Sequence, residues 1–356
     1  MLNYLLKLLI NDPVLIATTV LMLSAHAAFS QPPEVKLIKE EMLFESGRHF
    51  AQCHASTIEE SQGGTLLASW FAGSHEGSND VRIWGSVYDG TAWSAPMVWA
   101  DGRVSDDLQY PCWNPVLFRP KGEETIYLYY KVGPNPREWW GMVKSSDDGG
   151  QTWSEGKRLP DGTLGPIKNK PIELSDGTVL SPSSVELSEE RWLANIEASD
   201  AKQKQWTVYP IDHESNYNVI QPSILQHADG RLQVLCRSKE GVVATSWSSD
   251  QGKSWSALTK TNLVNPNSAT DAITVEKNFY IVYNPDIPGK DWWEGRSKLR
   301  LAYSSDGMHW EDLLALEDEE KGEFSYPTLF LDSNGLMHIT YTHDRKNIKH
   351  LVLEVD

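Results

Sequence analysis

The sequence predicts an all-β protein folded as a six-bladed β-propeller, because one short turn recurs along the chain and strand-like runs surround each copy. The turn is polar and ends in tryptophan. Its copies are YDGTAW at 88–93, SSDDGGQTW at 145–153, SDAKQKQW at 199–206, SSDQGKSW at 248–255 and YSSDGMHW at 303–310. The closing tryptophans lie 49 to 60 residues apart. A near-constant period of this kind indicates an array of equivalent units.

Each unit reads as several short strands. The runs TLLASWFAG, ETIYLYYKVG, RLQVLCRS and HITYTHD are rich in β-branched and aromatic residues, and glycine, aspartate or proline separates them. No capped amphipathic helix is predicted after the N-terminal segment. Units of this length with four strands each are typical of propeller blades. Five tryptophan-marked units and a final stretch, 323–356, make six, and residues 35–44 are expected to close the ring as the missing strand of the last blade.

The recurring turn has a structural explanation. Its aspartate can cap backbone amides, its glycine can adopt a positive φ, and its tryptophan can fill the gap between neighbouring strands. We therefore expect Asp148, Asp250 and Asp306 to hold hairpins at the rim and to perform no chemistry.

The N-terminus reads as a secretory signal. Residues 14–24 are apolar, and AHAAFS offers small residues before Gln31. The sequence thus predicts a signal peptide at 1–30, one domain at 31–356, and a secreted or periplasmic protein that contacts no membrane after cleavage. The alternative is an uncleaved membrane anchor. Cleavage is favoured because the apolar run is shorter than the roughly 20 residues that span a bilayer.

Charge and cysteine content exclude several classes of partner. The formal net charge is −17, which argues against nucleic acid and anionic membranes. A small anionic substrate is still compatible, since a few arginines can form a local positive pocket. The three cysteines, Cys53, Cys112 and Cys236, show no metal-ligand spacing and are expected to be buried thiols. No phosphate or dinucleotide fingerprint appears, so we predict no organic cofactor and no metal.

Two copies of the turn, SSDDGGQTW and SSDQGKSW, match the Asp box of sialidases. The segments IQPSILQHADGRLQVLCRS, NPNSATDAITV and GEFSYPTLFLDSNGLMHITY resemble the sialidase strands that flank the active site. Over roughly 45–356 the chain resembles the sialidase (neuraminidase)-like family with Asp-box, or BNR, repeats, in its divergent bacterial branch. The resemblance implies an exported exo-glycosidase, a glycoside hydrolase that removes a terminal acidic sugar from a glycan or polysaccharide. Asp boxes also occur in proteins without this activity, so function depends on the site residues.

Three family residues have counterparts. Tyr326 resembles the tyrosine nucleophile, Arg237 the second arginine of the carboxylate site, and Arg296 the third. A neutral tyrosine suits a 2-keto sugar acid, whose carboxylate lies beside the anomeric carbon and would repel a carboxylate nucleophile. Arginine can hold that substrate carboxylate through two parallel hydrogen bonds.

Two family residues are absent. Where the family has its first arginine, the chain has CHAS, so Cys53 or His54 stands there. We expect a protonated His54 to replace that arginine in part, which requires a pH below about 6.5. Where the family has the glutamate that activates the tyrosine, the chain has Ile220-Gln221-Pro222, and Glu323 or Glu186 could substitute. The sequence therefore predicts weak turnover of sialosides at neutral pH and a preference for another acidic sugar.

The family's acid/base aspartate falls in HEGSND, 75–80, where His75, Glu76 and Asp80 compete. Arg137 precedes Trp139 and Trp140, an arrangement that suits a sugar platform. The predicted catalytic residues are Tyr326, Glu323, His75, Asp80 and His54. The predicted substrate-binding residues are Arg237, Arg296, Arg137, Glu76, Asn267, Asp271 and Lys168.

Two other functions fit these residues. A polysaccharide lyase acting on a uronic-acid linkage would use His54 or His75 as base and Tyr326 as acid, and would tolerate the loss of the activating glutamate. A carbohydrate-binding propeller without turnover is the other. The ionisable residues in strand-end loops argue against pure binding, because a lectin site needs hydroxyl contacts more than proton donors.

Overall fold

The computed structural model describes residues 32–200, 202–291 and 293–355. The chain separates into two units, Met1–Pro33 and Glu34–Asp356, and the second carries the fold. The predicted signal peptide and its cleavage near Gln31 lie outside the described residues. In the described ranges, no helix is long and apolar enough to cross a membrane.

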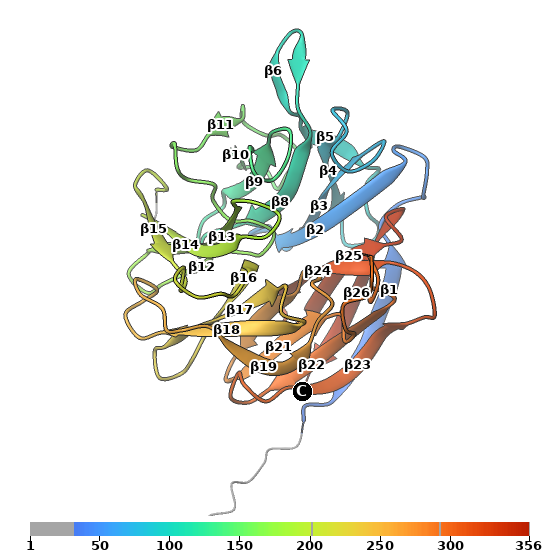
Figure 1. Cartoon of the computed structure of the whole chain (residues 1–356). Helices are drawn as coiled ribbons and strands as arrows, with labels where there is room; N and C mark the ends of the chain where they lie inside the picture. The colour runs from blue at the N-terminus through green and yellow to red at the C-terminus, as the bar shows by residue number, and fades with distance from the viewer. Residues whose placement is uncertain (1–31, 201, 292, 356) are drawn as a thin grey trace, which may run out of the picture. The chain divides into compact units, whose positions relative to one another are not determined.

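Every regular element in these ranges is a β-strand, and the strands form six four-stranded antiparallel sheets arranged as a propeller (Figure 1). The first strands of the sheets are β2 (Gln52–Glu60), β8 (Cys112–Phe118), β12 (Ile172–Glu173), β16 (Val219–Gln226), β20 (Asp271–Val275) and β24 (Phe324–Leu331). The second strands are β3 (Leu66–Gly73), β9 (Ile126–Val132), β13 (Val179–Glu186), β17 (Leu232–Ser238), β21 (Asn278–Tyr283) and β25 (Met337–His343). The third are β4 (Arg82–Tyr88), β10 (Trp140–Ser146), β14 (Trp192–Ser199), β18 (Val242–Ser248), β22 (Lys298–Ser304) and β26 (Asn347–Val355).

The outer strands are β5 (Met97–Ala100), β11 (Lys157–Arg158), β15 (Trp206–Pro210), β19 (Thr259–Val264), β23 (Glu311–Asp318) and β1 (Val35–Met42). We number the sheets blade 1 to blade 6 in the order of their first strands. A small hairpin, β6 (Arg103–Ser105) and β7 (Leu108–Gln109), lies outside the blades. The predicted six-bladed propeller is confirmed.

The ring closes as the sequence predicted. Strand β1 pairs antiparallel with β26, from Val35 opposite Val355 to Met42 opposite Lys349, and so becomes the outer strand of blade 6. Because the first and last strands of the propeller pair in one sheet, the two ends of the ring are joined by backbone hydrogen bonds.

The Asp boxes are hairpin clamps. Asp148 accepts hydrogen bonds from the Ser146 hydroxyl, the Thr152 amide and the Thr152 hydroxyl, at 2.8, 2.9 and 2.5 Å. Asp250 repeats the pattern with Ser248 and Ser254. The hydrogen bonds that Thr152 donates to Asp148, and Ser254 to Asp250, lower the pKa of each aspartate to about 2. Each of these carboxylates is thus saturated by its own turn, which supports the structural explanation.

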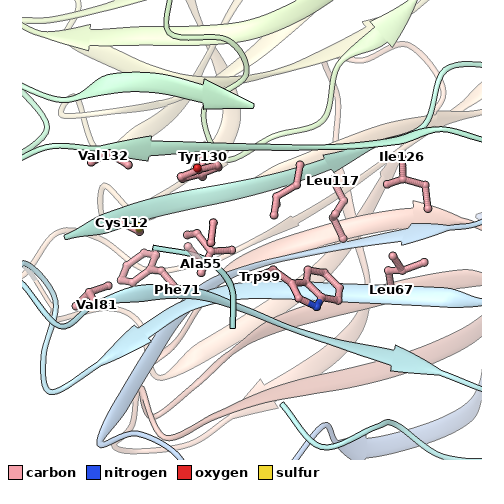
Figure 2. Close-up of a cluster of buried hydrophobic side chains, with 13 residues drawn as sticks. Ala55, Leu67, Phe71, Val81, Trp99, Cys112, Leu117, Ile126, Tyr130 and Val132 are labelled. Atoms are coloured by element: carbon pink, nitrogen blue, oxygen red, sulfur yellow. The ribbon is translucent and has the colours of Figure 1, made fainter. Parts of the chain in front are cut away.

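Apolar side chains fill the space between neighbouring blades. One cluster joins blade 1 to blade 2 and includes Ala55, Phe71, Trp99, Cys112 and Leu117 (Figure 2). The indole of Trp99 packs 5.1 Å from that of Trp153, the tryptophan that closes the second Asp box. Gly85 lies beneath this pair, and a Cβ there would come within 2.3 Å of the Trp99 ring. The box tryptophan therefore contributes to the core between two blades, whereas the sequence predicts only that it fills the gap between neighbouring strands.

The three cysteines are free and buried, so the prediction of buried thiols is confirmed. Burial raises the pKa of the thiols of Cys53, Cys112 and Cys236. They therefore stay protonated and pack as small apolar side chains.

A buried hydrogen-bonded chain spans the closing blade. The Glu41 carboxylate of β1 accepts from Trp93 and contacts His350 Nδ1, each at 3.0 Å. His350 Nε2 lies 2.9 Å from His338 Nδ1, and His338 Nε2 lies 3.3 Å from Asp332. Burial lowers the pKa of both histidines, that of His338 to about 4. Both imidazoles are therefore neutral in the folded protein near pH 7, and their two ring protons complete two of these three contacts as hydrogen bonds.

The two buried histidines predict that the protein loses stability in mild acid. A histidine whose pKa is lower in the folded state than in the unfolded state stabilises the fold above pH 6.5 and loses that contribution as the pH falls toward 4. For His338 the loss amounts to about 3 kcal/mol. We expect the free energy of unfolding, measured by denaturant titration, to fall between pH 7 and pH 4.5, and to fall less in His338→Gln.

The matched control is His309→Gln, because His309 is exposed at the rim and its ion pair with Asp306 raises its pKa. That variant should lose stability between pH 7 and pH 4.5 at least as steeply as wild type, because a histidine with a raised pKa stabilises the fold at low pH and its removal takes that contribution away. An equally steep loss of stability in His338→Gln and wild type would contradict the assignment.

Candidate functional site

A left-handed residue recurs at the first strand of every blade, or just before it. Its members are Ala55, Asn114, Lys168, Gln221, Asn267 and Tyr326, with φ of 55°, 38°, 71°, 54°, 60° and 54°. In blades 1, 2, 4 and 6 the residue coincides with a shift in the pairing register between the first and second strands. Left-handed backbone costs a residue with a side chain about 1 kcal/mol. A bulge of this kind turns a side chain out of the sheet, and such bulges concentrate near binding sites.

Arg237, at the end of β17, joins three of these positions. Its guanidinium donates to the Tyr326 hydroxyl at 2.8 Å, to Gln221 Oε1 at 3.3 Å and to Asn267 Oδ1 at 2.9 Å. It also lies 5.4 Å from the ring centre of Trp192. The side chain is buried, and among the described residues no carboxylate forms an ion pair with it. Arg237 is thus a buried cation whose hydrogen-bond partners are all neutral.

Two further arginines lie around Glu323. Arg296 donates to Glu323 Oε1 at 3.1 Å, and Arg345 donates to Glu323 Oε2 at 2.8 Å. Arg345 also reaches Glu76 Oε2 at 2.6 Å. Although burial favours the neutral acid, Arg345 and Arg296 lower the pKa of Glu323, so it is ionised. Glu323 therefore orients both guanidinium groups.

Arg237 and Arg296 lie beside one tyrosine, and Arg345 lies beside the histidine that packs on it. The guanidinium carbons of Arg237 and Arg296 lie 5.7 and 5.9 Å from the ring centre of Tyr326. The imidazole of His54 lies 4.1 Å from the same ring, and its Nε2 lies 3.4 Å from Arg345. We call Arg237, Arg296, Arg345, His54 and Tyr326 the arginine site. It combines blades 1, 4, 5 and 6, although its residues span most of the domain.

Sequence reasoning missed Arg345. It lies in the turn between β25 and β26, where the amide of Lys346 donates to His343 and both Asp344 and Arg345 have positive φ. This is a type I′ hairpin turn, which side-chain-bearing residues rarely occupy. The sequence did contain a signal. An arginine stands in a short turn directly after β25, the strand that pairs with the strand of Tyr326.

His54 is neutral in the folded protein. Burial, followed by the positive charges of Arg345, Arg296, Arg237 and Lys168, holds its pKa well below 6.5. The expectation that a protonated His54 replaces the missing first arginine is therefore wrong, and Arg345 supplies a guanidinium beside it instead. Since arginine only donates, His54 Nε2 is the acceptor and the ring proton resides on Nδ1.

The loop at 74–80 contributes one residue to the arginine site. Glu76 pairs with Arg345, whereas His75 contacts Ser78 and Asp80 accepts from the amide and hydroxyl of Ser74. No contact of His75 or Asp80 with the arginine site is recorded in the described ranges. The structure thus brings together Glu76, Glu323, Asn267 and the arginine site, and leaves the two predicted proton carriers in their own turn.

Lys168 and Asp271 are both buried and hydrogen-bond to other blades. Lys168 Nζ donates to the carbonyl of Thr270, at 2.9 Å, and to that of Pro327, and burial lowers its pKa to about 8. Asp271 accepts from the Leu329 amide at 2.9 Å and from Ser223 at 3.1 Å. Both residues join the first strands of different blades. Their recorded hydrogen bonds position backbone beside Tyr326, so their place in the fold is that of braces.

Arg137 does not join the arginine site. Its side chain is 46% exposed and lies 3.9 Å from Glu189, and it lines a separate cavity. For metals, no group of three or more histidine, cysteine, aspartate or glutamate side chains suited to a metal ion is found in the described ranges.

Similar folds are known among solved structures. The Hadza microbial sialidase Hz136 superposes with a TM-score of 0.74 at 18% identity, over 88% of this chain and 68% of that one. A protein of unknown function from Dyadobacter fermentans gives 0.72 at 15% identity, over 91% and 100%. The NanB sialidase from Streptococcus pneumoniae gives 0.69 at 13%, over 88% and 70%. At these identities the similarity shows the fold.

Sequence comparison identifies the family. No curated protein matches the chain. The family model described as a BNR repeat-like domain matches residues 64–339, most of the propeller. The Asp-box resemblance is thereby confirmed, and the chain belongs to the BNR repeat-like domain family, with the propeller fold that sialidases share.

Proposed function

We propose that the protein is a glycosidase that removes a terminal acidic sugar from a glycan, with the sugar carboxylate bound at the arginine site. The observation that supports this most directly is the buried guanidinium of Arg237, whose three hydrogen-bond partners are neutral oxygen atoms. An unpaired buried charge is costly, and a substrate carboxylate would relieve that cost through charge-assisted hydrogen bonds. The net charge of −17 makes a local cluster of arginines more selective for a small anion than for a polyanion.

Tyr326 is the proposed nucleophile. Its left-handed backbone directs the phenol toward Arg237, which donates to the phenol oxygen at 2.8 Å. In the described residues no carboxylate hydrogen-bonds this oxygen, and Gln221 stands where the family has its activating glutamate. As the tyrosine oxygen bonds to the anomeric carbon and the glycosidic bond breaks, the phenol proton passes to solvent water. Negative charge that develops on the tyrosine oxygen is stabilised by Arg237 in place of a carboxylate base. Glu76, the loop residue that reaches the site, is the proposed acid/base.

The lyase alternative lacks a strong base at the arginine site. Abstraction of a proton beside a uronate carboxylate would rely on His54, whose low pKa makes it a poor base. Its acceptor nitrogen also faces Arg345. His75 has no recorded contact with the site. The geometry therefore favours hydrolysis over elimination.

Carbohydrate binding without turnover is favoured by one observation, the glutamine at position 221. Without a carboxylate beside Tyr326, a site could bind an acidic sugar and leave it intact. Fluorogenic glycosides of sialic acid and other 2-keto sugar acids, with uronate oligosaccharides, separate the three functions. Hydrolysis releases the fluorophore, elimination produces an unsaturated uronate that absorbs in the ultraviolet, and binding alone produces neither.

Removing an arginine from the site should weaken substrate binding. We expect Arg237→Ala or Arg345→Ala to lower kcat/KM at least tenfold and up to about a hundredfold, because one charge-assisted hydrogen bond contributes about 1.5–3 kcal/mol. The control is Arg300→Ala, whose guanidinium pairs with Asp318 in the outer part of blade 5. Steady-state kinetics on the best fluorogenic glycoside measure the effect. Unchanged kinetics in Arg237→Ala would exclude a carboxylate site there.

Removing the phenol oxygen should stop turnover and preserve binding. We expect Tyr326→Phe to lower kcat at least a thousandfold, because the nucleophile is lost, while the dissociation constant for the substrate changes less than tenfold. Rapid-quench kinetics and calorimetric titration measure the two quantities. Turnover retained by Tyr326→Phe would remove this residue from the chemistry.

A further inference from the structure

A second cavity, of about 290 Å³, lies between blade 2 and blade 3. One wall is formed by Arg137 and Trp139 of the loop that precedes β10 and by Trp140, the first residue of β10. The segment 158–164 forms another, and the end of β13, at 185–187, forms the third. We call this space the blade 2–3 cavity. Its volume is at the small end of the range for ligand pockets and matches one sugar ring rather than a long chain.

The lining combines apolar rings with charges that are already balanced. The Arg158 guanidinium lies 5.2 Å from the ring centre of Trp140 and 3.6 Å from Asp161. Arg137 lies 3.9 Å from Glu189. Since each arginine has a carboxylate partner, the cavity has little excess positive charge to attract an anion. Indole surfaces flanked by hydrogen-bonding groups suit a neutral pyranose, which offers an apolar face and a rim of hydroxyls.

Glu186 connects the cavity to the arginine site. It lies in the cavity wall, and the charges of Arg237, Lys239, Arg137 and Glu76 all act on its carboxyl group. Arg237 and Glu76 belong to the site proposed for the acidic sugar, and Arg137 belongs to the cavity. Burial is the largest influence and raises the pKa of Glu186. Glu186 also pairs with Trp192 across β13 and β14, and the Arg237 guanidinium lies 5.4 Å from the Trp192 ring centre, so the cavity wall and the arginine site share this tryptophan as a neighbour.

We propose that the blade 2–3 cavity is a second sugar site, which binds a neutral pyranose on the leaving-group side of the acidic sugar. The link between the two sugars rests on the proposed function, but the capacity of the cavity to bind a neutral pyranose does not. Terminal acidic sugars linked to a neutral pyranose are the substrate class that fills both sites.

The test is direct binding of neutral sugars. It is measured with the full chain and, in parallel, with a chain that begins at residue 32. Saturation-transfer NMR and tryptophan fluorescence titration are run with methyl glycosides of glucose, galactose, rhamnose and N-acetylglucosamine. At least one should bind in the millimolar range, and Trp140→Ala should weaken that binding at least tenfold. Trp247→Ala is the matched control, because Trp247 is also half-buried and carries an arginine, Arg231, 4.6 Å from its ring centre.

A second variant covers the case in which Trp140→Ala fails to fold. Leu187 lies in the cavity wall and is 63% exposed, so Leu187→Arg can fill the cavity without loss of core packing. It should also weaken binding at least tenfold. Val208→Arg, on the exposed side of β15, should have no effect.

Two results would overturn the inference. One is that no methyl glycoside binds. The other is that Arg237→Ala abolishes the binding while Leu187→Arg preserves it, which would place the neutral sugar at the arginine site. If the wild type binds neutral sugars but turns over none of the acidic substrates, the proposed glycosidase activity is contradicted and the neutral-sugar site is not.

Discussion

The burial of the Arg237 guanidinium against three neutral oxygen atoms is the interaction on which the proposed function of this protein depends. A buried arginine ordinarily pairs with a carboxylate, because desolvation of the charge is costly. Here glutamine occupies the position beside it, and the hydrogen bonds go to Gln221, Asn267 and Tyr326. In the proposed function, a glutamine at this position gives Tyr326 no carboxylate base and leaves Arg237 as a cation that a substrate anion can pair with.

Backbone strain positions these partners. Gln221, Asn267 and Tyr326 all have positive φ in the first strand of a blade or just before it, and Arg345 has it in a type I′ turn. Each conformation is unfavourable for a residue with a side chain. Rigid clamps at the rim, the Asp boxes, and closure of the ring by β1 hold the strands in place around them. Stable local turns and a closed ring thus support a strained centre.

The fold was predictable because its signals are local. An Asp box contains its own hydrogen-bond partners within five residues, so Asp148 and Thr152 report their geometry in the sequence. The closing strand followed from the spacing of the boxes. Part of the candidate site was also accessible, since Tyr326 and Arg237 lie in segments that resemble known strands and Arg296 precedes the last Asp box.

The rest required the three-dimensional arrangement. Arg345 lies in a turn of blade 6 and His54 in the first strand of blade 1, near opposite ends of the sequence. No sequence spacing relates the two residues, which meet only in the folded ring. In the 75–80 loop, periodicity does not specify which of three ionisable side chains turns inward, and Glu76 does so through its pair with Arg345. The charge of His54 could not be assigned either, because it depends on burial and on cations from four different strands or loops.

Arg237 has no carboxylate ion-pair partner in the part of the chain that the structure describes, and we propose that the ligand supplies one. Calorimetric titration of a sugar acid and of its carboxamide, into wild type and into Gln221→Glu, tests it most directly. The wild type should bind the acid at least tenfold more tightly than the amide, and a glutamate at position 221 should pair with Arg237 and remove most of that preference. Equal binding of acid and amide by the wild type, or an undiminished preference in Gln221→Glu, would contradict the claim.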